Sequence, residues 1–386
     1  MYNDNELVCK SVFDKRKYNM DIFIKWTLLF VASEAILTLI QFLLRKKEFK
    51  PAVRVVLIVV KALLAIAFAV LPMAGPVQLR PVQPFMMAMY AVLLTDAFAD
   101  IIYSIICAVK KSERKFSVSK AISLVLGVLF FVYGTVNMQV VLPHYHTYSS
   151  DKLTMVHTVI FAADIHVGSA QTFETLEKEV KAMVREKPEC IILGGDITDD
   201  YTTKEEMQKT FKLFGNCGVP VYYLYGNHDR QKHAEYANGI QFTAEELEKT
   251  IKDCGIIVLK DEYTQLAPDL LLLGREDISE EGERAKAETL KNPSPEKYLI
   301  VADHQPFEFK ENMATGMDLQ LSGHTHAGQL FPLRSLYSVI GYAYGDFKED
   351  NAIMNVSAGA CGWRVPFRTE KHCYYEVVKL TPENKG

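Results

Sequence analysis

The 386-residue chain lacks several features that would have assigned it quickly to a class of protein. Its seven cysteines form no CxxC pair and follow no regular spacing, which argues against a cysteine–zinc knot or a disulfide framework. We expect most of them to be small buried hydrophobic residues. No internal repeat or low-complexity tract stands out, so nothing in the sequence points to a repeat architecture.

Acidic residues are scarce in the first 150 positions. This part has 17 Lys and Arg against 9 Asp and Glu, a net charge of +8, whereas the remainder has 26 against 38, a net charge of −12. A basic, apolar first part followed by an acidic second part indicates a membrane region joined to a soluble domain. The acidic domain argues against a nucleic-acid partner, because binding the phosphate backbone requires a basic surface.

Four apolar stretches approach or exceed the roughly 20 residues that a membrane-spanning helix needs. They cover residues 22–44, 55–71, 85–109 and 121–142; the second is the shortest and the fourth contains no ionisable residue. We therefore expect a four-helix membrane region over residues 1–142, a linker over 143–157 and a soluble domain over 158–386.

Charged residues inside and between these stretches give two further expectations. Asp96 and Asp100 share one helix face and predict an ion pair with Lys61, although a substrate or ion path is the alternative. The basic loops near residues 45–54 and 110–120 favour the cytoplasm, which places the soluble domain outside. The basic residues before the first stretch favour the opposite orientation.

The second part of the chain carries five short segments rich in metal-binding side chains. Each follows an apolar run that predicts a strand, and helices near 172–187 and 203–215 separate the first three strands. This order implies parallel strands, whose ends bring the five segments to one edge of a sheet. A surface helix is expected over 279–291. The segments are Asp164-Ile165-His166, Gly195-Asp196-Ile197-Thr198-Asp199, Gly226-Asn227-His228-Asp229, His304-Gln305-Pro306 and Gly323-His324-Thr325-His326.

The side chains in these segments indicate a two-metal hydrolase. Carboxylate, imidazole and amide ligands without thiolate suit Mn²⁺, Fe or Zn²⁺, and we favour Mn²⁺. Two ions about 3.5–4 Å apart, bridged by Asp196, would clamp a phosphate and acidify a water molecule for attack. His228 follows the ligand Asn227 and is placed to protonate the leaving oxygen. The five histidines outside the segments are expected to be ordinary: His144, His146, His157, His233 and His372.

In order, the five segments resemble the pattern D-x-H, G-D-x-x-D, G-N-H-[DE], H, G-H-x-H of the calcineurin-like metallophosphoesterase superfamily, over roughly residues 156–380. The resemblance implies a four-layer α/β/β/α sandwich with a dinuclear site. It implies that one ion is held by Asp164, His166, Asp196 and His326, and the other by Asp196, Asn227, His304 and His324. His228 would be the acid, with Asp229 orienting it and Asp199 behind the ligands.

The segment Gly323–Gln329 is also similar to the membrane-associated bacterial branch of that superfamily, apart from Ala327 where glycine is common. We therefore expect a membrane-anchored, dinuclear metal-dependent phosphoesterase that acts on a phosphodiester or pyrophosphate. Membrane lipids are its expected surroundings, and a lipid-linked or cell-envelope compound its expected substrate. The alternatives are a nucleotide phosphodiesterase facing the cytoplasm and a non-catalytic membrane sensor or scaffold. The apolar stretch 330–347 is interpreted as a packed loop with a short helix, or as a lid that contacts acyl chains.

Overall fold

The computed structural model describes residues 28–29, 31–39, 51–74, 83–113, 115–168, 171–234, 237, 239–280, 282–363, 365 and 367–383. The chain divides into two compact units, residues 1–133 and residues 134–386. We describe each unit by itself.

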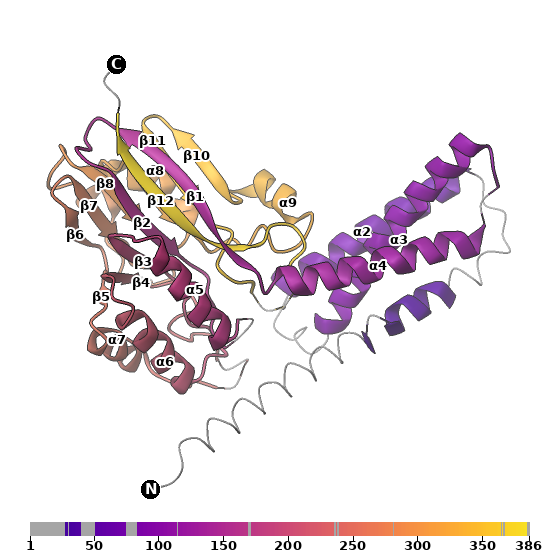
Figure 1. The fold of residues 1–386 in the computed structure, drawn as a ribbon, viewed down its shortest axis with the longest axis horizontal. Helices are drawn as coiled ribbons and strands as arrows, with labels where there is room; N and C mark the ends of the chain where they lie inside the picture. The colour runs from indigo at the N-terminus through magenta and orange to yellow at the C-terminus, as the bar shows by residue number, and fades with distance from the viewer. Residues whose placement is uncertain are drawn as a thin grey trace, which may run out of the picture. The chain divides into compact units, whose positions relative to one another are not determined.

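The described part of the N-terminal unit is mainly helical (Figure 1). Besides the helical residues 31–39 it contains α2 (Pro51–Ala74), α3 (Gln83–Lys110) and most of α4 (Phe116–Asn137). Within the described residues, two helical stretches are long and apolar enough to cross a membrane, Phe85–Lys110 and Val118–Asn137, while the apolar stretch Val55–Leu71 is shorter. Most of the first predicted span, 22–44, lies outside the described residues, so four spans are not confirmed.

Lys61 is paired with Asp96 and Asp100, as predicted. Lys61 Nζ lies 2.6 Å from Asp96 Oδ2 and 2.6 Å from Asp100 Oδ2. Lys120 adds a second cation, with its Nζ 2.5 Å from Asp96 Oδ1 and 3.4 Å from Glu34 Oε1. Because an isolated charge is costly away from water, this network lets four helical segments carry ionised groups on their inner sides.

The C-terminal unit contains two six-stranded mixed sheets (Figure 1). The first has the order β1-β12-β2-β3-β4-β5 and the second β10-β11-β9-β8-β7-β6. β2, β3 and β4 are parallel, as predicted, β5 continues this parallel set, and β7, β8, β9 and β11 form a second one. The strands are β1 (Val141–Ser150), β2 (His157–Ala162), β3 (Cys190–Gly194), β4 (Val221–Leu224), β5 (Ile257–Val258), β6 (Glu262–Ala267), β7 (Leu270–Gly274), β8 (Tyr298–Ala302), β9 (Leu319–Ser322), β10 (Gly345–Glu349), β11 (Ala352–Val356) and β12 (Cys373–Pro382).

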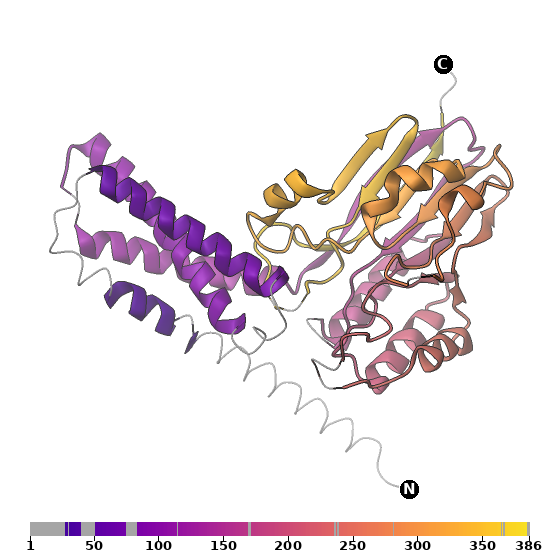
Figure 2. The same cartoon turned by 180° about the vertical axis from the view of Figure 1, so that it is seen from behind.

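Three hydrophobic layers hold the sheets and helices together, which agrees with the predicted sandwich. Alternate residues of β2 point to opposite faces, so Ile160 packs beneath the helices α5 (Phe173–Arg185), α6 (Lys204–Gly215) and α7 (Ala244–Asp253), while Phe161 packs against the second sheet. The outer face of the second sheet is covered by α8 (Phe309–Asn312) and its neighbours (Figure 2). Both faces of the inner parallel strands, such as β3, β4, β7, β8 and β9, are therefore buried, as parallel strands require.

Local sequence signals explain where two of the covering helices begin. The hydroxyl of Thr203 accepts from the backbone N–H of Glu206, and the Glu206 side chain accepts in return from the backbone of Thr203. Thr243 and Glu246 form the same capping box at the start of α7. Such a cap satisfies backbone donors that the first turn leaves free and contributes about 1 kcal/mol.

The predicted linker over 143–157 is wrong for most of its length. Its first part belongs to β1, which pairs in parallel with β12 along all ten of its residues. His144, His146 and Tyr148 alternate onto one face, which is a strand pattern. It was not recognised because the residues of this stretch are largely polar. The partner strand lies more than 200 residues later, so local sequence gave no sign of the pairing. β10 was also not predicted, because it lies in a polar stretch and its pairing with β11 depends on a turn within that stretch.

The predicted surface helix over 279–291 is also wrong. Within the described residues of this stretch only Ala287–Thr289 forms a helical turn, and it is a 3₁₀ turn. Gly282 has a φ of 84°, which interrupts a helix. Arg284 instead donates to the carboxylates of Asp303 and Glu308, with Nη2 2.6 Å from Asp303 Oδ2 and 2.7 Å from Glu308 Oε2. Tertiary ion pairs therefore hold this segment in a series of turns.

Candidate metal centre

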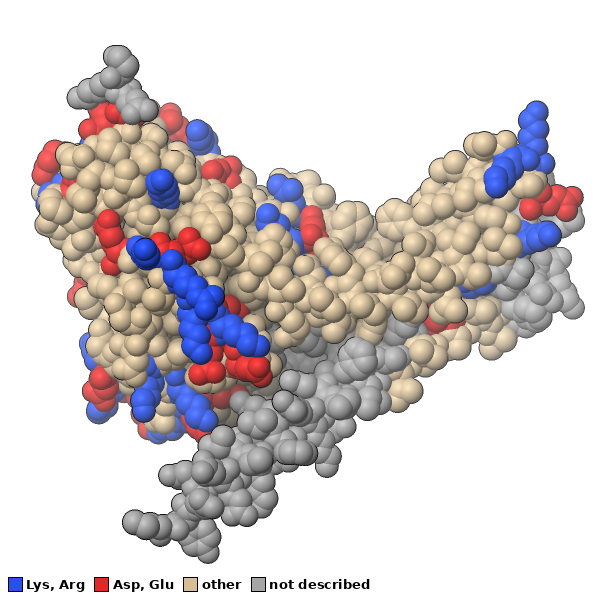
Figure 3. Space-filling model, in the orientation of Figure 1, with Lys and Arg blue, Asp and Glu red and all other residues tan. Residues whose placement is uncertain are grey.

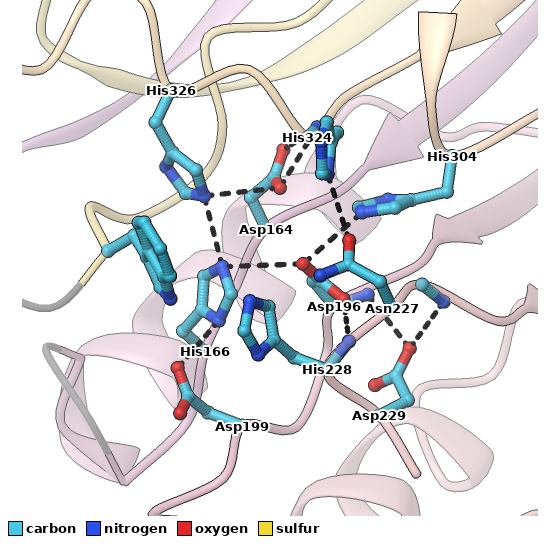
Figure 4. Close-up of polar contacts among 12 residues, drawn as sticks. Asp164, His166, Asp196, Asp199, Asn227, His228, Asp229, His304, His324 and His326 are labelled. Carbon is cyan, nitrogen blue, oxygen red and sulfur yellow. Dashed lines mark hydrogen bonds and ion pairs between the residues drawn. The ribbon is translucent and has the colours of Figure 1, made fainter. Parts of the chain in front are cut away.

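The five predicted segments lie at the carboxyl ends of five strands from both sheets. β2 leads to Asp164 and His166, β3 to Asp196, and β4 to Asn227, while β8 and β9 of the second sheet lead to the remaining histidines, His304, His324 and His326. Figure 4 shows these side chains turned toward one another. The structure thus brings all seven predicted ligands, which span more than 160 positions of sequence, to one end of the sandwich.

The backbone at this edge adopts conformations that side-chain-bearing residues rarely use. Five of the seven predicted ligands have positive φ: Asp164 (58°), His166 (47°), Asp196 (52°), His324 (71°) and His326 (45°). A left-handed residue other than glycine costs up to about 1–2 kcal/mol. The turn that each one makes directs its side chain back over the strand ends instead of along the strand.

A first group of ligands comprises Asp164, His166 and His326, all buried. His326 Nε2 lies 3.3 Å from Asp164 Oδ1 and 3.0 Å from His166 Nε2. Two imidazole nitrogens face each other at this distance. The other nitrogen of His166, Nδ1, lies 2.8 Å from Asp199 Oδ2, which favours a proton on Nδ1 and a lone pair on Nε2. A cation between the facing nitrogens would satisfy both lone pairs.

A second group comprises Asp196, His304 and His324. His304 Nδ1 donates to the carbonyl oxygen of Gly194 at 2.9 Å, which fixes the proton on that nitrogen. Its other nitrogen, Nε2, then faces Asp196 Oδ2 at 3.2 Å. A lone pair facing a carboxylate is repulsive, so a proton or a metal ion must lie between them. The amide oxygen of Asn227 lies 2.9 Å from His324 Nδ1 and belongs to the same side of the site.

Asp196 stands between the two groups. Its Oδ2 is 3.2 Å from His304 Nε2 in one group and 3.8 Å from His166 Nε2 in the other. Its Oδ1 accepts from the backbone N–H of His228 at 2.8 Å, which fixes the orientation of the carboxylate. The side chain is therefore positioned as a bridge, and the donor set fits two divalent cations.

Buried polar atoms and shifted pKa values support this fit. His304 Nε2, the nitrogen that faces Asp196, is buried, and none of the described residues gives it a hydrogen bond of good geometry. Burial opposes ionisation of the carboxyls, yet neighbouring histidines, His326 first, lower the pKa of Asp164 to about 2. Histidines led by His304 likewise hold the pKa of Asp196 well below its usual value. Both carboxylates are thus ionised at neutral pH, as metal ligation requires.

Gly226 allows the β3 and β4 loops to approach each other closely. A Cβ at this position would overlap Asp196 Oδ1 and the Asp196 backbone nitrogen. Only glycine therefore lets the loop with Asn227 lie directly against the loop with Asp196. This explains why a glycine precedes the asparagine in the third segment.

His228 is held by Asp200, not by Asp229. Its Nδ1 lies 3.0 Å from Asp200 Oδ2. Burial disfavours the imidazolium, but the charges of Asp196 and the bond to Asp200 outweigh it and raise the pKa of His228 to about 9. A protonated His228 is then available as an acid at neutral pH.

Asp229 has a different task from the one that the resemblance implied. Its Oδ2 accepts from the backbone N–H groups of Asp196 and Gly226, both at 2.8 Å, and its Oδ1 accepts from the N–H of Thr198 at 2.9 Å. No contact between its side chain and the His228 ring is recorded in the described part of the chain. Asp229 therefore ties together the two loops that carry Asp196 and Asn227.

Two residues of the site were missed at the level of sequence. Asp200 directly follows Asp199, and the doubled aspartate was its only signal. Trp363 comes from the segment between β11 and β12 and lies across two site histidines, with ring centroids 5.4 Å from His228 and 6.3 Å from His326. Nothing near Trp363 in the sequence indicates its position, because a distant turn brings it to the site.

Comparison with known proteins agrees with this geometry. Residues 157–328 match the family of calcineurin-like phosphoesterases. The chain is 28% identical over 249 residues to an uncharacterised metallophosphoesterase of Helicobacter pylori, covering 61% of this chain and 63% of the relative. It is 27% identical over 179 residues to phosphodiesterase YaeI of Escherichia coli, covering 45% of this chain and 61% of the relative.

A third relative is the transmembrane protein with metallophosphoesterase domain of Danio rerio, 24% identical over 228 residues, which cover 54% of this chain and 50% of the relative. The chain thus matches less than two thirds of the length of each of these relatives. It carries a calcineurin-like metallophosphoesterase domain, the domain of a class of phosphoric ester hydrolases.

The division of work between Asp200 and Asp229 is testable. We predict that Asp200→Asn lowers kcat for bis-p-nitrophenyl phosphate by about 10–100-fold without loss of bound metal, because it weakens the hold on His228 while its amide oxygen can still accept from the backbone N–H of His233. Asp229→Asn should instead reduce bound metal, because the loops that carry the ligands lose their common acceptor. Steady-state kinetics and elemental analysis of the same samples measure both effects. Metal loss in Asp200→Asn, or full metal content in Asp229→Asn, would contradict these roles.

Proposed function

We propose that this chain is a membrane-anchored, dinuclear metal-dependent phosphoesterase that hydrolyses a phosphodiester or a pyrophosphate. The observation that carries the proposal is the position of Asp196 Oδ2 between two groups of buried carboxylate and imidazole ligands. When bound, two divalent cations neutralise phosphate oxygens and make a water molecule acidic enough to attack at neutral pH. Mn²⁺ is the favoured cation, with Fe and Zn²⁺ also compatible with these ligands.

The chain's own residues supply the remaining parts of the reaction. His228 holds a proton on an imidazole that is only 7% exposed and gives it to the oxygen of the leaving group. Asp200 keeps that imidazole charged and oriented. Trp363 packs beside the rings of His228 and His326 and limits the access of water to them. Asp199 orients His166 from behind, opposite to the side that faces the ligands.

The membrane anchor is proposed to consist of four spans, over residues 22–44, 55–71, 85–110 and 118–137. The last ends earlier than the predicted stretch 121–142, because Val141 and Leu142 belong to β1. The support for the anchor is the apolar character of α3 and α4, together with many exposed apolar side chains on α2 to α4. On the face drawn in Figure 3, charged side chains of this unit gather mainly where α3 turns into α4, and most of the helical surface is uncharged. The name of the Danio rerio relative is consistent with an anchored domain of this class.

We further propose that the metallophosphoesterase domain lies outside the cytoplasm, because the loops near 45–54 and 110–120 are the most basic. We predict that protease added to intact cells cleaves the domain, while a cytoplasmic marker stays whole. Complete protection of the domain in intact cells, with cleavage after lysis, would reverse the orientation. It would then favour a nucleotide phosphodiesterase facing the cytoplasm.

A lipid-linked or cell-envelope substrate is proposed from the apolar surface at α9 (Leu333–Ile340). Phe331, Leu336 and Val339 are exposed, with 84% of the Val339 side chain accessible. Exposed apolar groups of this size, two on one short helix and one just before it, are costly in water and favourable against acyl chains. The segment begins only a few residues after His326, so a lipid held there would have its headgroup phosphate near the metal centre.

Hydrolysis of bis-p-nitrophenyl phosphate by the detergent-solubilised full chain with Mn²⁺ tests the activity. We predict that Asp196→Asn and His228→Ala each lower kcat by at least about 100-fold, the first through loss of the bridge and the second through loss of the acid. His372→Ala, a histidine outside the site, is the matched control and should retain activity. Absence of hydrolysis with Mn²⁺, Fe and Zn²⁺ alike would leave a non-catalytic sensor or scaffold as the better description.

The lipid surface has its own test. We predict that Leu336→Ser with Val339→Ser lowers kcat/KM for a prenyl pyrophosphate in vesicles by about tenfold or more, because withdrawing even one apolar side chain from an acyl environment costs about 1.5–3 kcal/mol. The same variant should hydrolyse soluble bis-p-nitrophenyl phosphate at the wild-type rate. An equal change for both substrates would assign α9 a purely structural role.

A further inference from the structure

A second cluster of metal-binding side chains lies apart from the seven ligands of the dinuclear centre. It consists of His144 and His146 on β1 and Glu376 on β12. Both histidines were expected to be ordinary, because no strand was predicted at their position. The folded chain brings them together with a carboxylate that is more than 200 residues away in sequence.

The register of the paired strands brings these side chains together. His144 and His146 are two residues apart on β1, so they share one face of the strand. Glu376 is the direct neighbour of His144 in the parallel pairing of β1 with β12. From the second sheet, Asp346 of β10 and Asn355 of β11 reach the same place, with Asn355 Nδ2 donating to Asp346 Oδ1 at 2.8 Å. The cluster therefore lies between the edges of the two sheets.

Three donor atoms meet at nearly equal separations. His144 Nδ1 is 2.9 Å from Glu376 Oε2, His146 Nε2 is 3.0 Å from His144 Nδ1, and His146 Nε2 is 3.1 Å from Glu376 Oε2. Ligands bound at about 2.0–2.1 Å around a tetrahedral Zn²⁺ are separated by roughly 3.3 Å. The three atoms thus already form a triangle close to one face of such a tetrahedron.

Hydrogen bonds alone cannot satisfy all the polar atoms of this triangle. His146 Nε2 faces three groups at once: the nitrogen of His144, the carboxylate of Glu376 and the amide nitrogen of Asn355 at 3.3 Å. One ring nitrogen cannot donate to the carboxylate and also accept from the two nitrogens. Glu376 is fully buried, and its second oxygen, Oε1, has no hydrogen-bond partner among the described residues. A cation at the centre of the triangle would accept both imidazole lone pairs and neutralise the carboxylate.

We propose that His144, His146 and Glu376 bind a third metal ion, a divalent transition-metal cation of which Zn²⁺ fits the ligands best. Two imidazoles and one carboxylate are a zinc-binding set that leaves a fourth position for water. The His144 side chain is 30% exposed and so gives the ion a path to solvent. Asp346 Oδ1, 3.6 Å from His146 Nδ1, adds a negative charge beside the ligand from the second sheet. The ion would therefore link β1 to β12 and, through His146, to the opposite sheet.

Metal content of the detergent-solubilised full chain tests this site. Protein stripped with chelator, reloaded with Zn²⁺ and dialysed is measured by elemental analysis. We expect His146→Gln and His144→Gln each to retain one zinc equivalent per chain fewer than wild type. His372→Gln is the matched control, because His372 lies near this edge but outside the triangle, and it should retain the wild-type content.

Two comparisons separate this site from the dinuclear centre and from misfolding. Asp196→Asn should lower the metal content of the dinuclear centre. Adding His146→Gln to Asp196→Asn should still remove one further zinc equivalent per chain. Wild-type circular dichroism and retained phosphodiester hydrolysis show that the His144→Gln and His146→Gln variants are folded. If folded variants bind as much zinc as wild type, the third site does not exist and the cluster is a histidine–carboxylate hydrogen-bond network. Failure of the proposed phosphoesterase activity would not alter the zinc difference.

Discussion

The carboxylate of Asp196 is the group on which the catalytic end of the molecule depends. Its two oxygens face different partners: Oδ1 takes a backbone N–H from His228, and Oδ2 faces histidines from both ligand groups. Such a position is electrostatically unfavourable without positive charge, because a buried carboxylate would face imidazole lone pairs. Two bound cations reverse the sign of these interactions. The same atoms that repel one another in the absence of positive charge then become ligands.

The fold is organised to keep this unfavourable arrangement in place. Five ligands adopt left-handed backbone conformations, at a cost of up to about 1–2 kcal/mol each. Taken together, that is comparable with the whole free energy of unfolding of an ordinary domain, about 5–15 kcal/mol. The cores on both faces of the first sheet and the hydrogen bonds of Asp229 supply the opposing stabilisation. Metal binding adds to it, because ions bind the folded site and not the unfolded chain.

The sequence predicted those features that depend on local pattern. Apolar β-branched runs such as the one before Asp164 give strands, and parallel strands between helices converge at their carboxyl ends, so the ligand set was accessible without a structure. β1 was not accessible, because its stability comes from β12 at the far end of the chain. Asp200 and Trp363 were missed because hydrogen-bond partners and loop positions depend on tertiary contacts. The residues near Arg284 were expected to be helical, but ion pairs to Asp303 and Glu308 decide their course.

The central claim, a carboxylate shared by two cations, is tested most directly by anomalous diffraction at the manganese absorption edge from crystals of the Mn²⁺-loaded protein. Two adjacent peaks, one on each side of the Asp196 side chain, are expected. A single peak, or peaks that leave Asp196 without a metal neighbour, would contradict the dinuclear centre.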